Sequence, residues 1–320
     1  MKVLANDGIS QSGIKALEAA GFTVDTNHIP QDQLIQGFND GGYCGILVRS
    51  ATTVRKDMMD ACPNMKFVGR GGVGMDNIDV AYGRENGIDV FNTPSASSQS
   101  VGELVMGHLF AGARGLHDAN RRMAGSDADG FKSLKKKFGK GMELRGKKLG
   151  IIGFGRIGRS TASYALGCGM DVVASDLFPN DEPIKLNVAG QTLEVKVPHI
   201  DMSELIKTCD CISIHVPKQK DGSAVIGENE LSAMKDGVIL INAARGGVID
   251  EDALLAALSS EKVRYAALDV YENEPTPRQD LLNHDGIGVS PHIGAATLEA
   301  QDRIGTELAE NIIRVMDAIA

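Results

Sequence analysis

A glycine-rich turn follows an apolar segment that is typical of a buried strand. The segment covers residues 147–152, and Gly153-Phe-Gly-Arg-Ile-Gly158 comes directly after it, before a helical pattern. In such a turn Gly153 permits a tight bend, Gly155 lets the backbone approach a ligand, and Gly158 lets the helix pack closely on the strand. The helix start offers unpaired N–H groups and a positive dipole end to an anion. The arrangement predicts a site for a dinucleotide pyrophosphate.

An acidic residue completes this pattern. Asp176 ends the next predicted strand, 18 residues beyond Gly158. A carboxylate at this distance can accept hydrogen bonds from the adenosine ribose and would repel a 2′-phosphate, so the cofactor is predicted to be NAD rather than NADP. A tight turn without a ligand would explain the glycines, but not the strand, helix and acid together.

Three polar side chains follow three further predicted strands. Arg245 lies in Asn242-Ala-Ala-Arg-Gly-Gly247, Glu274 in Glu272-Asn-Glu-Pro275, and His292 in Ser290-Pro-His-Ile-Gly-Ala295. Hydride transfer at a hydroxyl-bearing carbon needs a base for the hydroxyl proton, a cation for a carboxylate and a group that orients the base. Singly, each residue has an ordinary explanation as a surface arginine, a turn acid or a core histidine. Their shared place at strand ends, where open α/β sheets bind ligands, favours catalysis.

Short apolar runs alternate with helical patterns along the chain, which indicates an α/β fold with parallel sheets. A first array has strands near residues 3–5, 23–25, 45–48 and 66–69. A second, from residue 148, has six strands and an inserted hairpin near 186–197. Between them, residues 92–100 have the composition of a linker, and Ser100 and Glu103 predict a capping box that opens a long helix reaching about Met123. The final helix, about 298–319, could complete the second sheet or pack on the first domain.

Composition limits the partners. The net charge of −9 argues against general binding of nucleic acid or anionic membranes, and no apolar run is long enough to span a bilayer. The N-terminus has no signal-peptide pattern, and the five cysteines have no disulfide or zinc spacing, so we expect a cytoplasmic protein without a metal site. Seven lysines and Arg145 between residues 132 and 148 run against the acidic balance, and alone they are typical of a solvated loop.

These motifs give the chain a resemblance to the D-isomer-specific 2-hydroxyacid dehydrogenases over essentially its whole length. The resemblance rests on Leu144-Arg-Gly-Lys-Lys-Leu-Gly-Ile-Ile-Gly-Phe-Gly-Arg-Ile-Gly158, Ile214-His-Val-Pro217, Leu240-Ile-Asn-Ala-Ala-Arg-Gly-Gly247, Ala267-Leu-Asp-Val-Tyr271, Glu274-Pro275 and Pro291-His-Ile-Gly294. It implies a doubly wound Rossmann nucleotide domain, residues 100–295, inserted into a smaller flavodoxin-like substrate domain built from residues 1–99 and 296–320.

The resemblance also implies roles for single residues. Arg245 would clamp the substrate carboxylate and C2 oxygen, His292 would be the acid/base, and Glu274 would hydrogen-bond His292. The cofactor contacts it implies are Gly153, Gly155, Arg156, Ile157, Gly158, Asp176, Val216 and Pro217 on the adenosine and pyrophosphate side, and Asn242, Ala243, Asp269 and Gly294 on the nicotinamide side.

Within the family, the chain resembles the members that act on 3-phosphoglycerate in serine synthesis, in a short form without their C-terminal regulatory domain. Arg49, Ser50 and the loop Gly71-Gly72-Val73 match substrate loops, and a basic run that includes Lys135 suits a substrate with both a carboxylate and a phosphate. Family dimers pack nucleotide domains through residues 101–145, so we expect a homodimer.

Two other functions stay open at this point. One is a hydroxypyruvate or glyoxylate reductase of the same family, which would not need the lysines. The other is an NAD-sensing corepressor, a binding protein on the same scaffold. The acidic balance of the chain counts against the corepressor.

Overall fold

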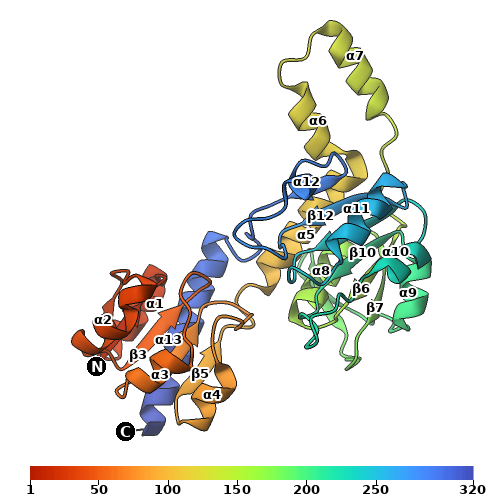
Figure 1. Cartoon of the computed structure of the whole chain (residues 1–320). Helices are drawn as coiled ribbons and strands as arrows, with labels where there is room; N and C mark the ends of the chain where they lie inside the picture. Colours follow the sequence, from red (N-terminus) through yellow and green to blue (C-terminus); the bar gives the residue numbers. More distant parts are fainter. Residues whose placement is uncertain (320) are drawn as a thin grey trace. The chain divides into compact units, whose positions relative to one another are not determined.

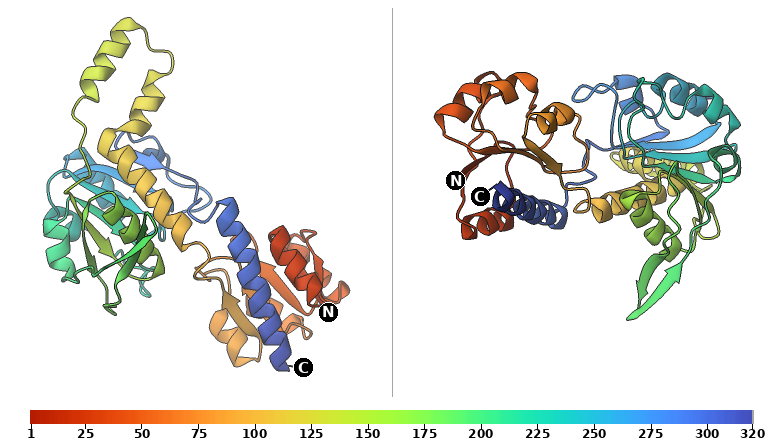
Figure 2. Two further views of the ribbon diagram at one scale, coloured as in Figure 1. Left: turned by 180° about the vertical axis from the view of Figure 1, so that it is seen from behind. Right: turned by 90° about the horizontal axis from the view of Figure 1, so that it is seen from below.

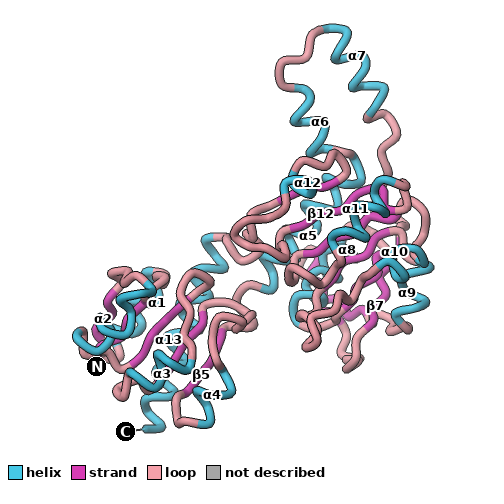
Figure 3. The backbone as a smooth tube through the Cα atoms, viewed as in Figure 1, coloured by secondary structure: helices cyan, strands magenta, loops and turns pink. Residues whose placement is uncertain are grey.

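The computed structural model describes residues 1–319, which form two compact units. Unit 1 comprises residues 1–98 and the chain from residue 295 onward, and unit 2 comprises residues 99–294. The units thus divide after residues 98 and 294, each one residue before the boundary expected from the sequence, which was after residues 99 and 295. In both units strands and helices alternate along the chain (Figure 3). No helix in residues 1–319 combines the length and apolar character needed to cross a bilayer.

Unit 1 is built on a five-stranded parallel sheet with the order β2-β1-β3-β4-β5. Its strands are β1 (Lys2–Ala5), β2 (Thr23–Asp25), β3 (Gly45–Val48), β4 (Phe67–Arg70) and β5 (Asp89–Asn92). Its helices are α1 (Gln11–Ala19), α2 (Leu34–Asp40), α3 (Lys56–Ala61), α4 (Val80–Glu85) and α13 (Leu298–Ile319). This is the flavodoxin-like order, which confirms the predicted fold class of this part. Strand β5 was not predicted from the sequence, because this short strand runs directly into the linker.

The final helix belongs to unit 1, which settles the alternative that the sequence left open. Ile304, Leu308 and Ile312 of α13 are buried in one cluster with apolar residues of β1, α1, β3 and β4. The helix crosses α1 closely, because a Cβ on Gly13 would lie 2.6 Å from the backbone oxygen of Gly305. Two segments from opposite ends of the chain therefore share one core.

Unit 2 contains a six-stranded parallel sheet with the order β13-β12-β11-β10-β6-β7. Its strands are β6 (Lys148–Ile152), β7 (Asp171–Ser175), β10 (Cys211–Ile214), β11 (Val238–Asn242), β12 (Val263–Leu268) and β13 (Ile287–Val289). It also has α5 (Ser98–Arg114), α8 (Arg156–Gly167), α9 (Met202–Thr208), α10 (Glu228–Ala233), α11 (Glu251–Ser259) and α12 (Gln279–Leu282). An isolated parallel bridge between Ala174 of β7 and His199 adds a further edge position beyond β7, and with it the order is that of a doubly wound Rossmann sheet, as predicted.

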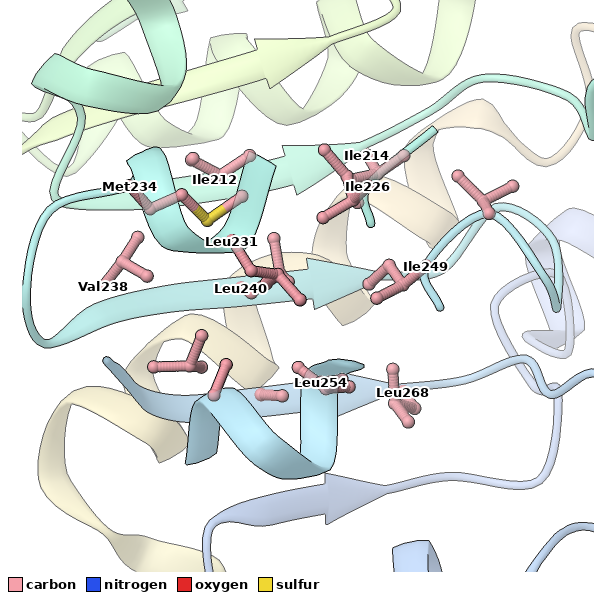
Figure 4. Packing of buried hydrophobic residues seen from close by; sticks show 14 of the residues in the cluster. Ile212, Ile214, Ile226, Leu231, Met234, Val238, Leu240, Ile249, Leu254 and Leu268 are labelled. Carbon is pink, nitrogen blue, oxygen red and sulfur yellow. The ribbon is translucent and has the colours of Figure 1, made fainter. Parts of the chain in front are cut away.

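One face of this sheet is covered by an apolar cluster. Figure 4 shows Ile212 of β10 and Leu240 of β11 in this cluster, together with Leu231 of α10 and Leu254 of α11. Because both faces of a parallel sheet are buried, its strands are continuous apolar runs, and β11 is buried at all five positions. The predicted hairpin is present as the antiparallel pair β8 (Ile184–Val188) and β9 (Gln191–Val195).

The predicted long helix is wrong in its start and in its continuity. It starts at Ser98, so Ser100 lies inside α5 and donates its hydroxyl hydrogen to the backbone oxygen of Gly294 instead of capping the helix. The helix ends before Gly115, which takes a left-handed conformation with φ 64°. Beyond it, α6 (Leu116–Met123) and α7 (Ala128–Lys137) extend as an arm away from the sheet of unit 2 (Figures 1 and 2).

Candidate active site

The three predicted catalytic residues follow three adjacent strands of unit 2. Arg245 follows β11, Glu274 follows β12 and His292 follows β13, and these strands are neighbours in the parallel sheet. The carboxyl ends of parallel strands meet at one edge, so the loops after them converge. The glycine turn after β6 and Asp176 after β7 lie at the same edge. One edge of one sheet therefore carries both the expected cofactor residues and the expected catalytic residues.

The structure brings His292 and Glu274 into direct contact. The His292 Nδ1 atom lies 2.8 Å from the Glu274 Oε2 atom, and the other carboxylate oxygen accepts a hydrogen bond from the backbone N–H of Tyr271 at 3.0 Å. The carboxylate is thus fixed by its own loop and holds one ring nitrogen. The opposite nitrogen, Nε2, is directed away from the pair, and the side chain is 45% exposed. The imidazole is oriented by Glu274 in the way expected of a general acid/base.

The backbone of His292 has φ 52°, in the left-handed region that a histidine rarely adopts. Such strain persists only where the surrounding structure holds it, and it is often found at functional sites. The holding contacts come from Asp269, which accepts hydrogen bonds from the backbone N–H groups of Ile293 at 2.9 Å and Gly294 at 2.8 Å.

Arg245 lies in a loop that packs against the loop carrying Glu274. The Asn242 side chain bridges this loop, donating to the Arg245 backbone oxygen at 2.9 Å and accepting from the Ala244 N–H at 3.0 Å. The next residue, Gly246, leaves no room for a side chain, because a Cβ would lie 1.8 Å from the backbone oxygen of Tyr271. This close approach places the Arg245 loop beside the Tyr271–Glu274 turn.

The glycine turn has the shape that a dinucleotide requires. Gly153 has φ 90°, and a Cβ there would meet the His215 backbone oxygen at 2.6 Å; a Cβ on Gly158 would meet the Gly153 oxygen at 2.2 Å. Gly155 is different, because a Cβ there would have open space around it, where a phosphate can approach the backbone. With α8 beginning at Arg156, its first N–H groups, including that of Ile157, face this space. These residues fit NAD.

Asp176, which was expected to bind the ribose, also forms hydrogen bonds with the glycine turn. One carboxylate oxygen accepts a hydrogen bond from the backbone N–H of Phe154 at 2.5 Å, and the other accepts from that of Phe178 at 2.8 Å. The sequence pattern predicted only a ribose contact for this acid. The structure adds that it fixes the turn between Gly153 and Gly155.

The other expected cofactor residues lie at the same sheet edge. Val216 and Pro217 follow β10, and a Val216 methyl group would be 2.8 Å from a Cβ on Gly153. Asn242 ends β11 and Ala243 follows it. Asp269, expected at the nicotinamide, is 1% exposed and holds the loop around His292.

A hollow of about 360 Å³ lies beside the His292–Glu274 pair within unit 2. Its walls are mainly apolar, with contributions from Tyr271, Pro275 and Leu282. No lysine or arginine is among the described residues that line it. The hollow therefore provides space next to His292, without a lysine or arginine to pair with a phosphate.

The expected substrate loops Arg49-Ser50 and Gly71-Gly72-Val73 lie in unit 1, after β3 and β4. The Asp7 carboxylate, which no sequence pattern indicated, fixes the first loop by accepting hydrogen bonds from the N–H groups of Arg49 at 2.6 Å and Thr52 at 3.1 Å. A Cβ on Gly72 would lie 1.6 Å from the Arg70 Nη1 atom, so this guanidinium lies over the second loop.

Lys135 lies in unit 2, on the exposed surface of α7 in the arm. The lysines at 132–137 are thus on a helix and not in the solvated loop considered from the sequence. Lys137 pairs with Asp118 of α6 at 2.6 Å, and Lys132 pairs with Asp129 at 3.1 Å.

Comparison with known proteins identifies the family. Residues 106–294 match the model described as "D-isomer specific 2-hydroxyacid dehydrogenase, NAD binding domain". The chain belongs to the D-isomer-specific 2-hydroxyacid dehydrogenase family. The predicted NAD-dependent enzyme class and the predicted cofactor are therefore confirmed.

Relatives in this family differ in their substrates. The chain is 40% identical to hydroxypyruvate reductase of Thermotoga maritima, over 98% of this chain and 97% of that protein. It is 39% identical to D-3-phosphoglycerate dehydrogenase of Methanocaldococcus jannaschii, over 99% of this chain but 57% of that protein. The chain therefore spans little more than half of the second relative. Among solved structures, a glyoxylate reductase from Paecilomyes thermophila has a TM-score of 0.82 at 27% identity, covering 98% of this chain and 94% of that one.

Proposed function

We propose that this enzyme transfers a hydride between NAD and C2 of a D-2-hydroxy acid, with 3-phosphoglycerate as its substrate and 3-phosphohydroxypyruvate as the product. The observation that carries the proposed chemistry is the His292–Glu274 pair, with 2.8 Å between Nδ1 and Oε2 at the sheet edge that also carries the glycine turn. Oxidation yields the 2-oxo acid, NADH and one proton; reduction reverses these changes.

Each catalytic side chain has one task in this proposal. Arg245 binds the substrate carboxylate and the C2 oxygen, because a guanidinium pairs with both as a planar donor. His292 takes the hydroxyl proton through Nε2 during oxidation and returns it to the C2 oxygen during reduction. Glu274 holds Nδ1 and stabilises the imidazolium that forms. NAD, when bound, supplies the nicotinamide carbon that accepts or donates the hydride.

Two observations support a phosphorylated substrate. The loops at Arg49-Ser50 and Gly71–Val73 resemble those of phosphoglycerate dehydrogenases, and Arg70 places a second guanidinium over Gly72 in unit 1. We assign the carboxylate to Arg245 and propose that the phosphate is bound by basic residues of the substrate loops, with Lys135 as a further candidate.

A second candidate substrate is hydroxypyruvate or glyoxylate. It is favoured by the Thermotoga maritima relative, which matches along nearly its full length, and by the lack of a lysine or arginine among the described residues that line the hollow beside His292. An enzyme for these smaller acids would need no phosphate contact.

We further propose that the protein is a homodimer formed through the arm. Phe110, Leu116, Met123 and Phe131 on α5, α6 and α7 are each at least 43% exposed. Three of these large apolar side chains lie on the arm and one on the helix before it, and exposed apolar side chains of this kind are typical of a protein–protein interface.

The acid/base assignment is tested with His292→Ala and Glu274→Gln. His292→Ala should lower kcat by about 10³-fold or more, because it removes the proton donor while leaving the glycine turn intact. Glu274→Gln keeps a hydrogen-bonding side chain and should cost less. NADH fluorescence measures cofactor binding, which should change little in either variant. If His292→Ala lost NADH binding as well, the residue would hold the cofactor and not the proton.

The substrate is tested by following NADH oxidation with 3-phosphohydroxypyruvate, hydroxypyruvate and glyoxylate. A higher kcat/KM for the phosphorylated acid supports the first proposal, and equal or better values for the other two support the second. Charge reversal of Lys135, Lys136 and Lys137 is the matched variant. It should lower kcat/KM only for the phosphorylated acid if these lysines contact the phosphate, and for none of the acids if they do not.

A further inference from the structure

A chain of buried hydrogen bonds leads from α5 to the loop that carries His292. The His108 Nε2 atom lies 3.1 Å from the Ser290 Oγ atom, which lies 2.6 Å from the Asp269 Oδ1 atom. Their exposed fractions are 5% for His108, 8% for Ser290 and 1% for Asp269. Neither His108 nor Ser290 has a role in the chemistry described above.

The direction of each hydrogen bond follows from the carboxylate. The Asp269 carboxylate accepts two backbone N–H groups, so Ser290 donates its single hydroxyl hydrogen to it. The Ser290 oxygen must then accept from His108, which requires a proton on Nε2. Burial lowers the pKa of His108 to about 4, so this ring carries one proton at neutral pH. Its Nδ1 atom has no hydrogen-bond partner among the described residues.

The chain ends on the group that holds the strained loop. Asp269 receives one hydrogen bond from Ser290, two residues before His292, and two from the residues directly after it. The carboxylate is therefore bonded on both sides of the residue with φ 52°. Its orientation determines where the backbone places the His292 imidazole.

If position 108 served only to pack the core, a histidine would be less favourable there than an apolar side chain. Its helix neighbours Val105, Met106 and Leu109 are buried apolar side chains, so a leucine would suit the same face. A buried imidazole with an unpaired nitrogen carries a desolvation penalty that leucine avoids.

We propose that His108 and Ser290 are positioning residues for the reaction. Together they fix the Asp269 carboxylate, and through it the loop that presents His292 to the substrate. The inference rests on the proposed acid/base role of His292. Small displacements of a catalytic group are enough to slow a reaction strongly.

The test compares His108→Leu, His108→Gln, Ser290→Ala and the double variant His108→Leu/Ser290→Ala. The assay is NADH oxidation with the fastest of the three 2-oxo acids named above. His108→Leu and Ser290→Ala should each lower kcat about tenfold. His108→Gln should recover most of the loss, because its amide can donate to Ser290. The double variant should be no slower than Ser290→Ala, because His108 acts only through that hydroxyl.

Thermal unfolding separates positioning from packing. His108→Leu should unfold at the same temperature as the wild type or higher while its kcat falls, which loss of packing would not produce. Wild-type kcat in His108→Leu, or losses that multiply in the double variant, would overturn the inference. Turnover that survives in His292→Ala would instead overturn the proposed function.

Discussion

At the scale of single residues, burial of His108 makes the free energy of unfolding depend on pH. Burial, together with the nearby His117, lowers its pKa from 6.5 to about 4 in the folded protein. Between these values the unfolded chain binds a proton that the folded chain does not, so stability falls as the pH drops from 6.5 to 4. The shift corresponds to at most about 3 kcal/mol.

His108→Gln removes this titration and should reduce the loss of stability across the same pH range. Urea unfolding of the wild type and the variant at pH 7, 6, 5 and 4 measures the difference. An equal dependence of the unfolding free energy on pH in the two proteins would contradict the prediction. Burial also lowers the pKa of His215 to about 4. Because His215 is still present in His108→Gln, part of the dependence of the unfolding free energy on pH should remain in that variant.

The residues that follow strands could be predicted, and the residues that support them could not. Arg245, Glu274 and His292 stand out because each follows an apolar run and has a side chain suited to chemistry. His108 lies in a helix whose pattern shows only that it faces inward. Its partner Ser290 is 182 residues away, a contact that only the fold creates.

At the scale of elements, the Tyr265 ring holds β12, β13 and α5 together by filling the space left by two glycines. A Cβ on Gly288 of β13 would lie 1.8 Å from the Tyr265 hydroxyl, and a Cβ on Gly112 of α5 would lie 2.2 Å from its ring. The hydroxyl has no hydrogen-bond partner among the described residues.

Gly288→Ala should therefore lower the free energy of unfolding by about 2 kcal/mol through overpacking. Tyr265→Phe should restore much of this loss, since it removes the atom nearest to the new methyl group. Urea unfolding of the two single variants and the double variant measures the coupling. Additive losses in the double variant would show that the hydroxyl is not the obstacle.

Local sequence patterns predicted most helices and strands but failed where a long-range contact determines where a helix begins. Ser100 and Glu103 have the spacing of a capping box, yet Ser100 donates to Gly294, and Glu103 accepts from the Tyr164 hydroxyl at 2.6 Å. The helical pattern also continued through Gly115, because one glycine in a helix is tolerated. Its left-handed φ, which begins the arm, could not be inferred from periodicity.

At the scale of the whole molecule, the doubly wound sheet in unit 2 and the flavodoxin-like sheet in unit 1 could be predicted. Alternating strands and helices indicate parallel sheets, and the family resemblance supplied the split of unit 1 between the two ends of the chain. The amphipathic pattern of the final helix did not predict which of the two sheets it packs against. It depends on the complementary surface around Gly13 and Leu17 of α1.

This split of unit 1 has a consequence for synthesis on the ribosome. Unit 2 is continuous in sequence, so all of its strands have been made before α13 begins at Leu298. The five strands of unit 1 are translated before unit 2, but Ile304, Leu308 and Ile312, which bury the α13 side of that sheet, are translated after it. The nascent chain therefore leaves this apolar surface of unit 1 without its α13 cover while unit 2 is completed, and transiently exposed apolar surface of this kind makes a chain prone to aggregate.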